Sequence, residues 1–402
     1  MSGDIEVEQR EPGGLSATER ELWTAFRLSQ PELYSPYFDV RYALAAGEAA
    51  PGARIAVIRR RGRIVGFLPF QRRGGMIQPL AAPLTDYHGL IAGPGARIDL
   101  AAVVRALGSK RFRFSGLIRA PAKGAANLTP KPAMIADLSG GFDAYLERRS
   151  AAGQGSFLKD KRRRLRALER DHGPVEFTFS ADPAEVLDLI VDLKREQMTR
   201  TGQVDVFACG WTVQLIRDLA ARAEADFGVR FAAMRAGGRI IAAEVGLLSG
   251  DAYHLWFPVY DPDFARYSPG ALMTLETLKA AAAQGVRTID FGAGAEDYKL
   301  SFAEPGREVF EGDVIVGGWA GAGLSTLRLA LAPAPAVKRQ VKKAASRIDR
   351  RLDRITACEP HLVGRVGAAS KLLTYVGRRH PRLASVLGAA VTLGAGAMLL
   401  AE

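Results

Sequence analysis

The chain has 402 residues, 48% of them hydrophobic, and carries a formal net charge of +12. This length exceeds one ordinary domain, and the hydrophobic fraction is sufficient for sizeable cores. Positions 333–382 hold 13 Lys and Arg against 3 acidic residues, a net +10, so the rest of the chain carries only about +2. The nearly neutral charge of the chain outside residues 333–382 argues against nucleic-acid binding.

The N-terminal region begins with a polar segment. Residues 1–15 have no apolar stretch, so they are predicted to be disordered and not to form a signal peptide, which favours a cytoplasmic protein. A helix is predicted from Ser16 to about Ser29, because Ser16 and Glu19 have the capping-box spacing. Residues 31–45 follow as a turn and a short helix.

A predicted hairpin at residues 53–70 recurs later in the chain. RIAVIRRRGRIV at 54–65 and RFAAMRAGGRII at 230–241 share six of twelve positions, and a Pro-Gly-Ala segment and a short strand follow each at similar offsets. We interpret this as a duplication that gave two related α/β halves. The alternative is chance similarity between two common Gly-Arg hairpins.

Polar side chains interrupt the apolar segment PLAAPLTDYHGLIA at residues 79–92. Asp86, Tyr87 and His88 are adjacent there, which indicates an active-site loop or a hydrogen-bonded turn. We take all three as candidate substrate-binding residues.

Residues 156–171 are predicted to form a strongly basic helix, SFLKDKRRRLRALERD. Its six Lys and Arg residues between 159 and 166 surround the helix without forming a clean stripe. A solvated helix with ion pairs is one interpretation, and a basic wall that holds the phosphates of a ligand is the other.

The segment 251–302 has the clearest order of elements. An alternating strand at 252–260 is followed by Asp-Pro-Asp, a helix from about Ser268 to Gln284, and a short strand that ends at Phe291. Ser268 suits the N-cap and Pro269 the first helical position. If the amides of Gly270, Ala271 and Leu272 are unpaired, this helix start can bind an anion. An ordinary capped crossover is the alternative.

The order YHLWFPVYD…YSPGALMTLETLKAAAAQG…IDFGAGAEDYKLSF resembles the acetyltransferase domain of CelD-like proteins, named for cellulose biosynthesis, in the GNAT superfamily. These are similar to FemAB-type transferases, and the resemblance covers roughly residues 15–320. It implies an α/β fold of tandem GNAT-like halves, 16–150 and 151–322, each a mostly antiparallel mixed sheet flanked by helices. It also implies an acyl-CoA donor, acetyl-CoA by family type, with its pyrophosphate at Ser268–Leu272.

Direct acyl transfer requires a base for the acceptor and a group that stabilises the developing oxyanion. His254 is the candidate base, and alternation places it on one face with Trp256, a candidate substrate contact. Asp290 is predicted to orient or deprotonate the acceptor. The resemblance implies a role near the reaction centre for Tyr298 and Lys299. The alternatives are a buried core histidine for His254 and a loop cap for Asp290.

Beyond the two halves, residues 323–382 are predicted to be a basic helical segment and 383–402 an apolar C-terminal helix. Residues 383–401 are 19 uncharged positions, close to the length that spans a bilayer. The basic flank favours attachment to anionic lipid at the inner membrane. A buried or oligomerising helix is the alternative.

The helix start and the resemblance together predict an acyl-CoA-dependent N- or O-acyltransferase. The resemblance alone implies that its acceptor is a sugar or nucleotide sugar. No metal is expected, because Cys209 and Cys358 lie far apart and form no ligand motif. One alternative is a non-catalytic, membrane-docked accessory protein of a polysaccharide synthase. The other is a FemAB-like transferase that uses aminoacyl-tRNA, which the nearly neutral body disfavours.

Overall fold

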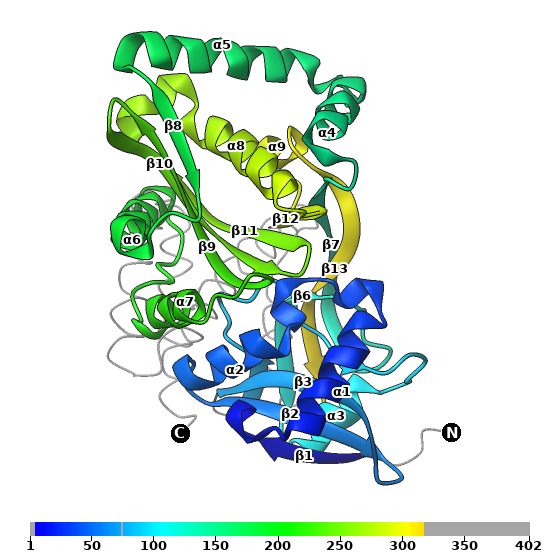
Figure 1. The fold of residues 1–402 in the computed structure, drawn as a ribbon. Helices are drawn as coiled ribbons and strands as arrows, with labels where there is room; N and C mark the ends of the chain where they lie inside the picture. Colours follow the sequence, from blue (N-terminus) through cyan, green and yellow to red (C-terminus); the bar gives the residue numbers. More distant parts are fainter. Residues whose placement is uncertain (1–4, 74, 317–402) are drawn as a thin grey trace, which may run out of the picture.

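The computed structural model describes residues 5–73 and 75–316, which form one mixed sheet of 13 strands with flanking helices (Figure 1). The strands are β1 (Glu6–Arg10), β2 (Ala53–Arg60), β3 (Arg63–Arg73), β4 (Met76–Pro79), β5 (Ile91–Ala92), β6 (Arg111–Leu117), β7 (Ala125–Asp137), β8 (Val175–Phe179), β9 (Phe227–Ala236), β10 (Arg239–Ser249), β11 (Ala252–Tyr260), β12 (Thr288–Ala293) and β13 (Glu304–Ile315). The helices are α1 (Ala17–Leu28), α2 (Val40–Ala49), α3 (Leu100–Ala106), α4 (Gly141–Arg149), α5 (Gly155–His172), α6 (Pro183–Thr201), α7 (Trp211–Ala221), α8 (Pro269–Ala283) and α9 (Asp297–Leu300).

The strand order confirms the predicted tandem halves. From one edge the sheet runs β1-β2-β3-β4-β6, and from the other it runs β8-β9-β10-β11-β12. In each run the first strands are antiparallel and the last two, β4 with β6 and β11 with β12, are parallel. The similar hairpins seen in the sequence are β2–β3 and β9–β10, which occupy equivalent places in the two runs.

The two halves exchange their last strands. β7 follows the first half in sequence but pairs with β12, whereas β13 follows the second half and pairs with β6. β7 and β13 pair with each other and join the two runs into one sheet. The predicted boundary at residue 150 therefore falls after the strand that enters the second half, inside the π-helical turn Ser150–Gln154 between α4 and α5.

The prediction that residues 1–15 are disordered is wrong for the described part of that segment. Glu6–Arg10 form β1, which pairs antiparallel with β2 at the edge of the sheet. The segment Glu-Val-Glu-Gln contains mostly polar residues, which suggested disorder. A strand at the edge of a sheet can nevertheless form with one polar face, because only its other face packs on the core. The capping box of Ser16 and Glu19 is present at the start of α1 as predicted.

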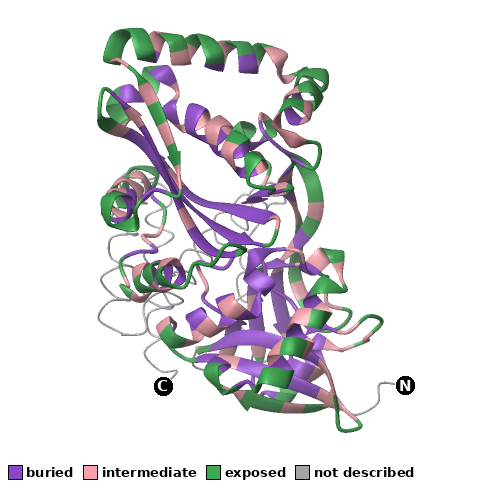
Figure 2. Ribbon diagram, viewed as in Figure 1, coloured by how far each residue is buried: buried purple, intermediate pink, exposed green. Residues whose placement is uncertain are grey.

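Helices cover both faces of the second half. α6 and α8 pack on opposite faces of β10 and β11, and strands β9, β10 and β11 between them are almost fully buried (Figures 1 and 2). α5 lies beyond α8 at the edge of the molecule (Figure 1). None of the described helices is both long and apolar enough to cross a bilayer. The predicted helices at 323–382 and 383–402 lie outside the described residues.

A carboxyl group is buried beneath α8. Glu244 on β10 is fully buried, one carboxylate oxygen lies 3.4 Å from the Tyr253 hydroxyl that donates to it, and burial raises the pKa of Glu244 to about 7. Between pH 4.5 and 7 the folded protein therefore holds one proton more than the unfolded chain, so the free energy of unfolding falls as pH rises through this window.

Replacing Glu244 with Gln should remove this loss of stability. We expect Glu244→Gln to raise the free energy of unfolding at pH 8 by up to about 3 kcal/mol and to change it little near pH 4.5. Urea unfolding at both pH values measures the effect, with Glu176→Gln, at an exposed position of β8, as the control. Parallel pH profiles for wild type and Glu244→Gln would refute this account of Glu244.

Candidate functional site

The first feature of the site is a histidine enclosed by carboxylates. His254 on β11 has no exposed surface, and its Nε2 lies 2.9 Å from a carboxylate oxygen of Asp86. Its Nδ1 lies 3.7 Å from Oδ1 of Asp290 on the neighbouring strand β12. His254 and Asp290 are adjacent because they are partners in the parallel register of β11 and β12. The Asp86 side chain is 43% exposed, so this carboxylate connects the buried imidazole to solvent.

Asp290 is held by groups from both halves. Its Oδ1 accepts hydrogen bonds from the Tyr87 hydroxyl at 2.7 Å and from the Gly292 amide at 2.8 Å. These bonds fix the carboxylate beside the imidazole. Burial, followed by the charge of Asp290, raises the pKa of Tyr87, so the phenol remains a donor to Asp290 at neutral pH.

Lys299, in the short helix α9 that follows β12, completes the group. Its ammonium donates to the carbonyl of Ala293 at 3.1 Å and lies 2.9 Å from the Glu296 carboxylate. A Cβ atom at Gly292, where φ is +80°, would lie 3.1 Å from Asp86 Oδ2, 3.8 Å from His254 Cε1 and 3.9 Å from Lys299 Nζ. The three side chains thus converge on the space that glycine leaves open. We call Asp86, Tyr87, His254, Asp290 and Lys299 the junction cluster, because both halves contribute to it.

Three other predicted residues have different surroundings. His88 points into the core of the first half, where it packs against Phe112 and Phe114 and burial lowers its pKa to about 3. The structure therefore does not bring His88 to the site. Trp256 lies beside the junction cluster, with its indole N–H donating to the Leu84 carbonyl at 3.0 Å. Tyr298 is 55% exposed and available to a ligand.

Sequence reasoning missed two residues of this site. Tyr37 packs edge-on against His254, with ring centroids 5.0 Å apart, and no hydrogen-bond partner for its buried hydroxyl exists in the described residues. Arg307 lies 3.7 Å from Asp290 and over the Tyr87 ring, and it donates to main-chain carbonyls of the first half. The two prolines and two tyrosines of residues 31–37 were the available signal for Tyr37. No local signal in the sequence points to Arg307, because it lies on β13 and reaches the site only through the exchange of strands between the two halves.

The donor end of the site depends on how β11 and β12 separate. Their parallel pairing covers Ala252 to His254 on β11 and Thr288 to Asp290 on β12. β11 continues to Tyr260, whereas the end of β12 pairs with β7. Among the described residues, no strand pairs with this edge of β11 beyond His254, so the edge can accept an extended ligand with amide groups, and it leads to the start of α8.

The start of α8 differs in part from its prediction. Ser268 occupies the N-cap position with φ of +58° but makes no side-chain capping bond, and its hydroxyl accepts from Lys161 Nζ at 3.2 Å. The amides of Ala271 and Leu272 donate to the Ser268 carbonyl, so the prediction that they are unpaired is wrong. Within the described residues the Gly270 amide has no such partner. The helix dipole, this amide and the Lys161 ammonium suit a phosphate group.

No metal centre is found in the part of the chain that the structure describes, where no three His, Cys, Asp or Glu side chains are grouped to hold an ion. The basic α5 contributes to the site through one side chain, Lys161, which is buried against α8 and Phe157.

Comparisons with known proteins agree with this geometry. Residues 155–300 match the family described as "Acetyltransferase (GNAT) domain". No curated protein matches the chain. A conserved protein of unknown function from Bacteroides thetaiotaomicron has 14% identity and a TM-score of 0.50 over 77% of this chain and 100% of its own, which supports the fold.

Two further solved structures are similar at lower scores. A tandem GNAT protein from the clavulanic acid biosynthesis pathway has 13% identity and a TM-score of 0.47 over 79% of this chain and 100% of its own. FemX has 12% identity and a TM-score of 0.44 over 77% of this chain and 97% of its own. The matched segment contains the separating strands, α8 and His254, Asp290 and Lys299 of the junction cluster, so residues 155–300 of this chain are a domain of the GNAT acetyltransferase type.

Proposed function

We propose that the protein transfers an acyl group, acetyl in the simplest case, from a CoA thioester to an amine or hydroxyl group of a sugar or nucleotide sugar. The observation that carries this proposal is the buried His254, bonded to the half-exposed Asp86 where β11 and β12 begin to separate. The resemblance of the sequence to CelD-like proteins of polysaccharide biosynthesis supports the sugar acceptor.

The donor has matching groups along the second half. The free edge of β11 suits the amides of the pantetheine arm, and the Gly270 amide with Lys161 suits the pyrophosphate. β11 runs from Ala252 to Tyr260, and Gly270 lies against the Tyr260 ring, so a thioester that extends along β11 from Gly270 would have its carbonyl towards the junction cluster. The bound thioester supplies an activated acyl carbon and a thiolate leaving group.

The junction cluster can accept and hold the acceptor's proton. Asp86 is the exposed member, so it contacts the acceptor amine or hydroxyl and takes its proton together with His254. Asp290 on the other side of the imidazole stabilises the positive charge that arises when His254 is protonated. Lys299, beside Asp86, is placed to stabilise negative charge on the carbonyl oxygen. No covalent acyl-enzyme is needed, because the cluster contains a base and no thiol or serine nucleophile.

Two finer points belong to this proposal. The basic segment 323–382 and the apolar segment 383–402 support attachment of a cytoplasmic enzyme to the inner membrane, next to a polysaccharide synthase.

A non-catalytic accessory role is the second candidate function. The junction cluster favours catalysis, because His254, Asp290 and Lys299 are buried, and burying ionisable groups lowers stability with no benefit to a purely structural protein.

The test is release of free CoA thiol from acetyl-CoA by the full-length protein in the presence of an acceptor panel. Glucosamine, UDP-glucosamine, glucose and lysine are suitable, with product mass measured by mass spectrometry. We expect an acetylated sugar product with wild type and at least a 10²-fold lower rate with Asp86→Asn, because the amide cannot take the proton. Thiol release that is equal in Asp86→Asn and wild type would remove the proposed base, and acetylation of lysine alone would remove the sugar acceptor.

A further inference from the structure

The outer face of α5 carries a stripe of positive charge that the site does not use. Five exposed cations lie on it, Lys159, Arg162, Arg163, Arg166 and Arg170. At 100° per residue these positions fall within about 100° of arc, and at 1.5 Å per residue they extend over about 16 Å. The two remaining cations, Lys161 and Arg164, point to the other side and bond to Ser268 and to the Arg266 carbonyl.

The acidic residues of α5 pair with two of the five cations of this outer stripe, and the third acidic residue, Glu169, makes no ion pair within the described residues. Asp160 bonds Arg163 and Arg164 from the flank of the helix, and Asp171 bonds Arg170 at its end. For Lys159, Arg162 and Arg166, with spacing i, i+3 and i+7, no ion pair or hydrogen bond occurs within the described residues. The outer stripe therefore contains three uncompensated cations in a row on a body that is otherwise nearly neutral.

The placement of α5 makes this stripe accessible to a flat partner. Only Leu158, Lys161 and Leu168 of the helix are buried, and α5 forms one end of the molecule, with its outer face exposed along its length (Figures 1 and 2). A bound RNA favours a concave basic surface with exposed aromatic side chains for stacking. The outer stripe is a straight row on a convex helix, and Phe157, the one aromatic residue of α5, packs against Phe302.

We propose that the outer stripe of α5 docks the enzyme on an anionic lipid bilayer. A row of Lys and Arg on a peripheral helix matches the negative surface potential of such a bilayer. The inner face of the same helix contributes Lys161 to the start of α8, so docking places the donor end of the site next to the membrane surface. This inference does not depend on the acceptor or on the chemistry of the junction cluster.

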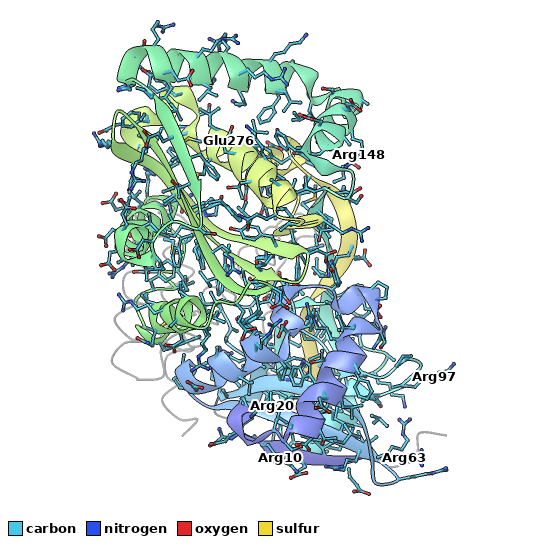
Figure 3. The ribbon with its side chains drawn as sticks, in the orientation of Figure 1. Arg10, Arg20, Arg63, Arg97, Arg148 and Glu276 are labelled. Carbon is cyan, nitrogen blue, oxygen red and sulfur yellow. The ribbon has the colours of Figure 1, made fainter. Side chains whose placement is uncertain are left out.

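The test uses the full-length protein and a matched pair of triple variants. Lys159→Glu, Arg162→Glu and Arg166→Glu together change the charge by six units on the outer stripe. Arg61→Glu, Arg63→Glu and Arg97→Glu make the same change at exposed positions without side-chain partners in the described residues. Arg63 and Arg97 lie at the opposite end of the molecule from α5 (Figure 3).

Sedimentation with phosphatidylglycerol–phosphatidylcholine vesicles at low salt measures the binding. Each removed surface cation weakens partition about fivefold, so we expect at least a 30-fold loss for the α5 variant and a clearly smaller loss for the control. Acyl transfer to a soluble acceptor should be unchanged in the α5 variant. Equal loss in both variants, or no loss in either, would overturn the proposal, as would binding of both wild type and control to single-stranded RNA in preference to the vesicles.

Discussion

Replacing His254 with Gln is expected to reduce kcat of acyl transfer by about 10²- to 10⁴-fold. The Gln amide can still bond Asp86, so the carboxylate remains in place, but it cannot accept a proton. The KM for the donor should change little, because the groups proposed to hold the donor phosphate lie at the start of α8, away from His254. Steady-state kinetics of thiol release with a saturating acceptor separate these two effects.

His172→Gln is the matched control for the His254 variant. This imidazole also belongs to the second half, but it lies at the end of α5 and contacts Phe264 and Tyr267, which are not part of the junction cluster. We expect its kcat to remain within about twofold of wild type. A His254→Gln enzyme with kcat within threefold of wild type would show that the junction cluster does not transfer the acceptor's proton.

The second large effect is expected at the start of α8. Gly270→Asp places a carboxylate beside the one amide of this helix start that has no partner in the described residues. The added negative charge repels the donor pyrophosphate and competes for the same amide, so the Kd for acetyl-CoA should rise at least tenfold. Calorimetric titration of the full-length protein measures this change.

Gly270→Asn provides the control for size, since Asn and Asp are nearly isosteric. A Cβ at position 270 would approach the Tyr260 ring to 3.2 Å, so both variants share a small steric cost. We expect the Asn variant to bind acetyl-CoA much more tightly than the Asp variant. Equal Kd values for Asp and Asn would mean that charge at this helix start is irrelevant, which is incompatible with a phosphate site there.

Local patterns in the sequence were sufficient to predict the hairpins, α8 and the division into two related halves. The related hairpins at 54–65 and 230–241 predicted two halves because local turn chemistry and alternation determine a hairpin. The exchange of β7 and β13 was beyond such reasoning. It depends on pairing between residues 151 to 204 positions apart, such as Thr288 with Asp137 and Ile315 with Arg111, and nothing in either strand specifies a partner.

The candidate site shows the same division between local and long-range information. His254 and Asp290 follow from one β-α-β unit, in which parallel strands place equivalent positions side by side. Asp86 was found from its polar character in an apolar segment, but its bond to His254 joins residues 168 positions apart. His88 was misjudged because the irregular backbone at 81–88 gives no alternation from which to infer the direction of a side chain.

Calorimetric titration of the wild-type, full-length protein with acetyl-CoA, with free CoA as the comparison, tests the central claim most directly. The free edge of β11 and the start of α8 predict saturable binding of one acetyl-CoA per chain, and binding of CoA itself through the same pantetheine and phosphate contacts. A folded protein, shown by a cooperative thermal transition, that gives no binding heat at several temperatures and no protection by acetyl-CoA against unfolding would contradict the proposed donor site and the function built on it.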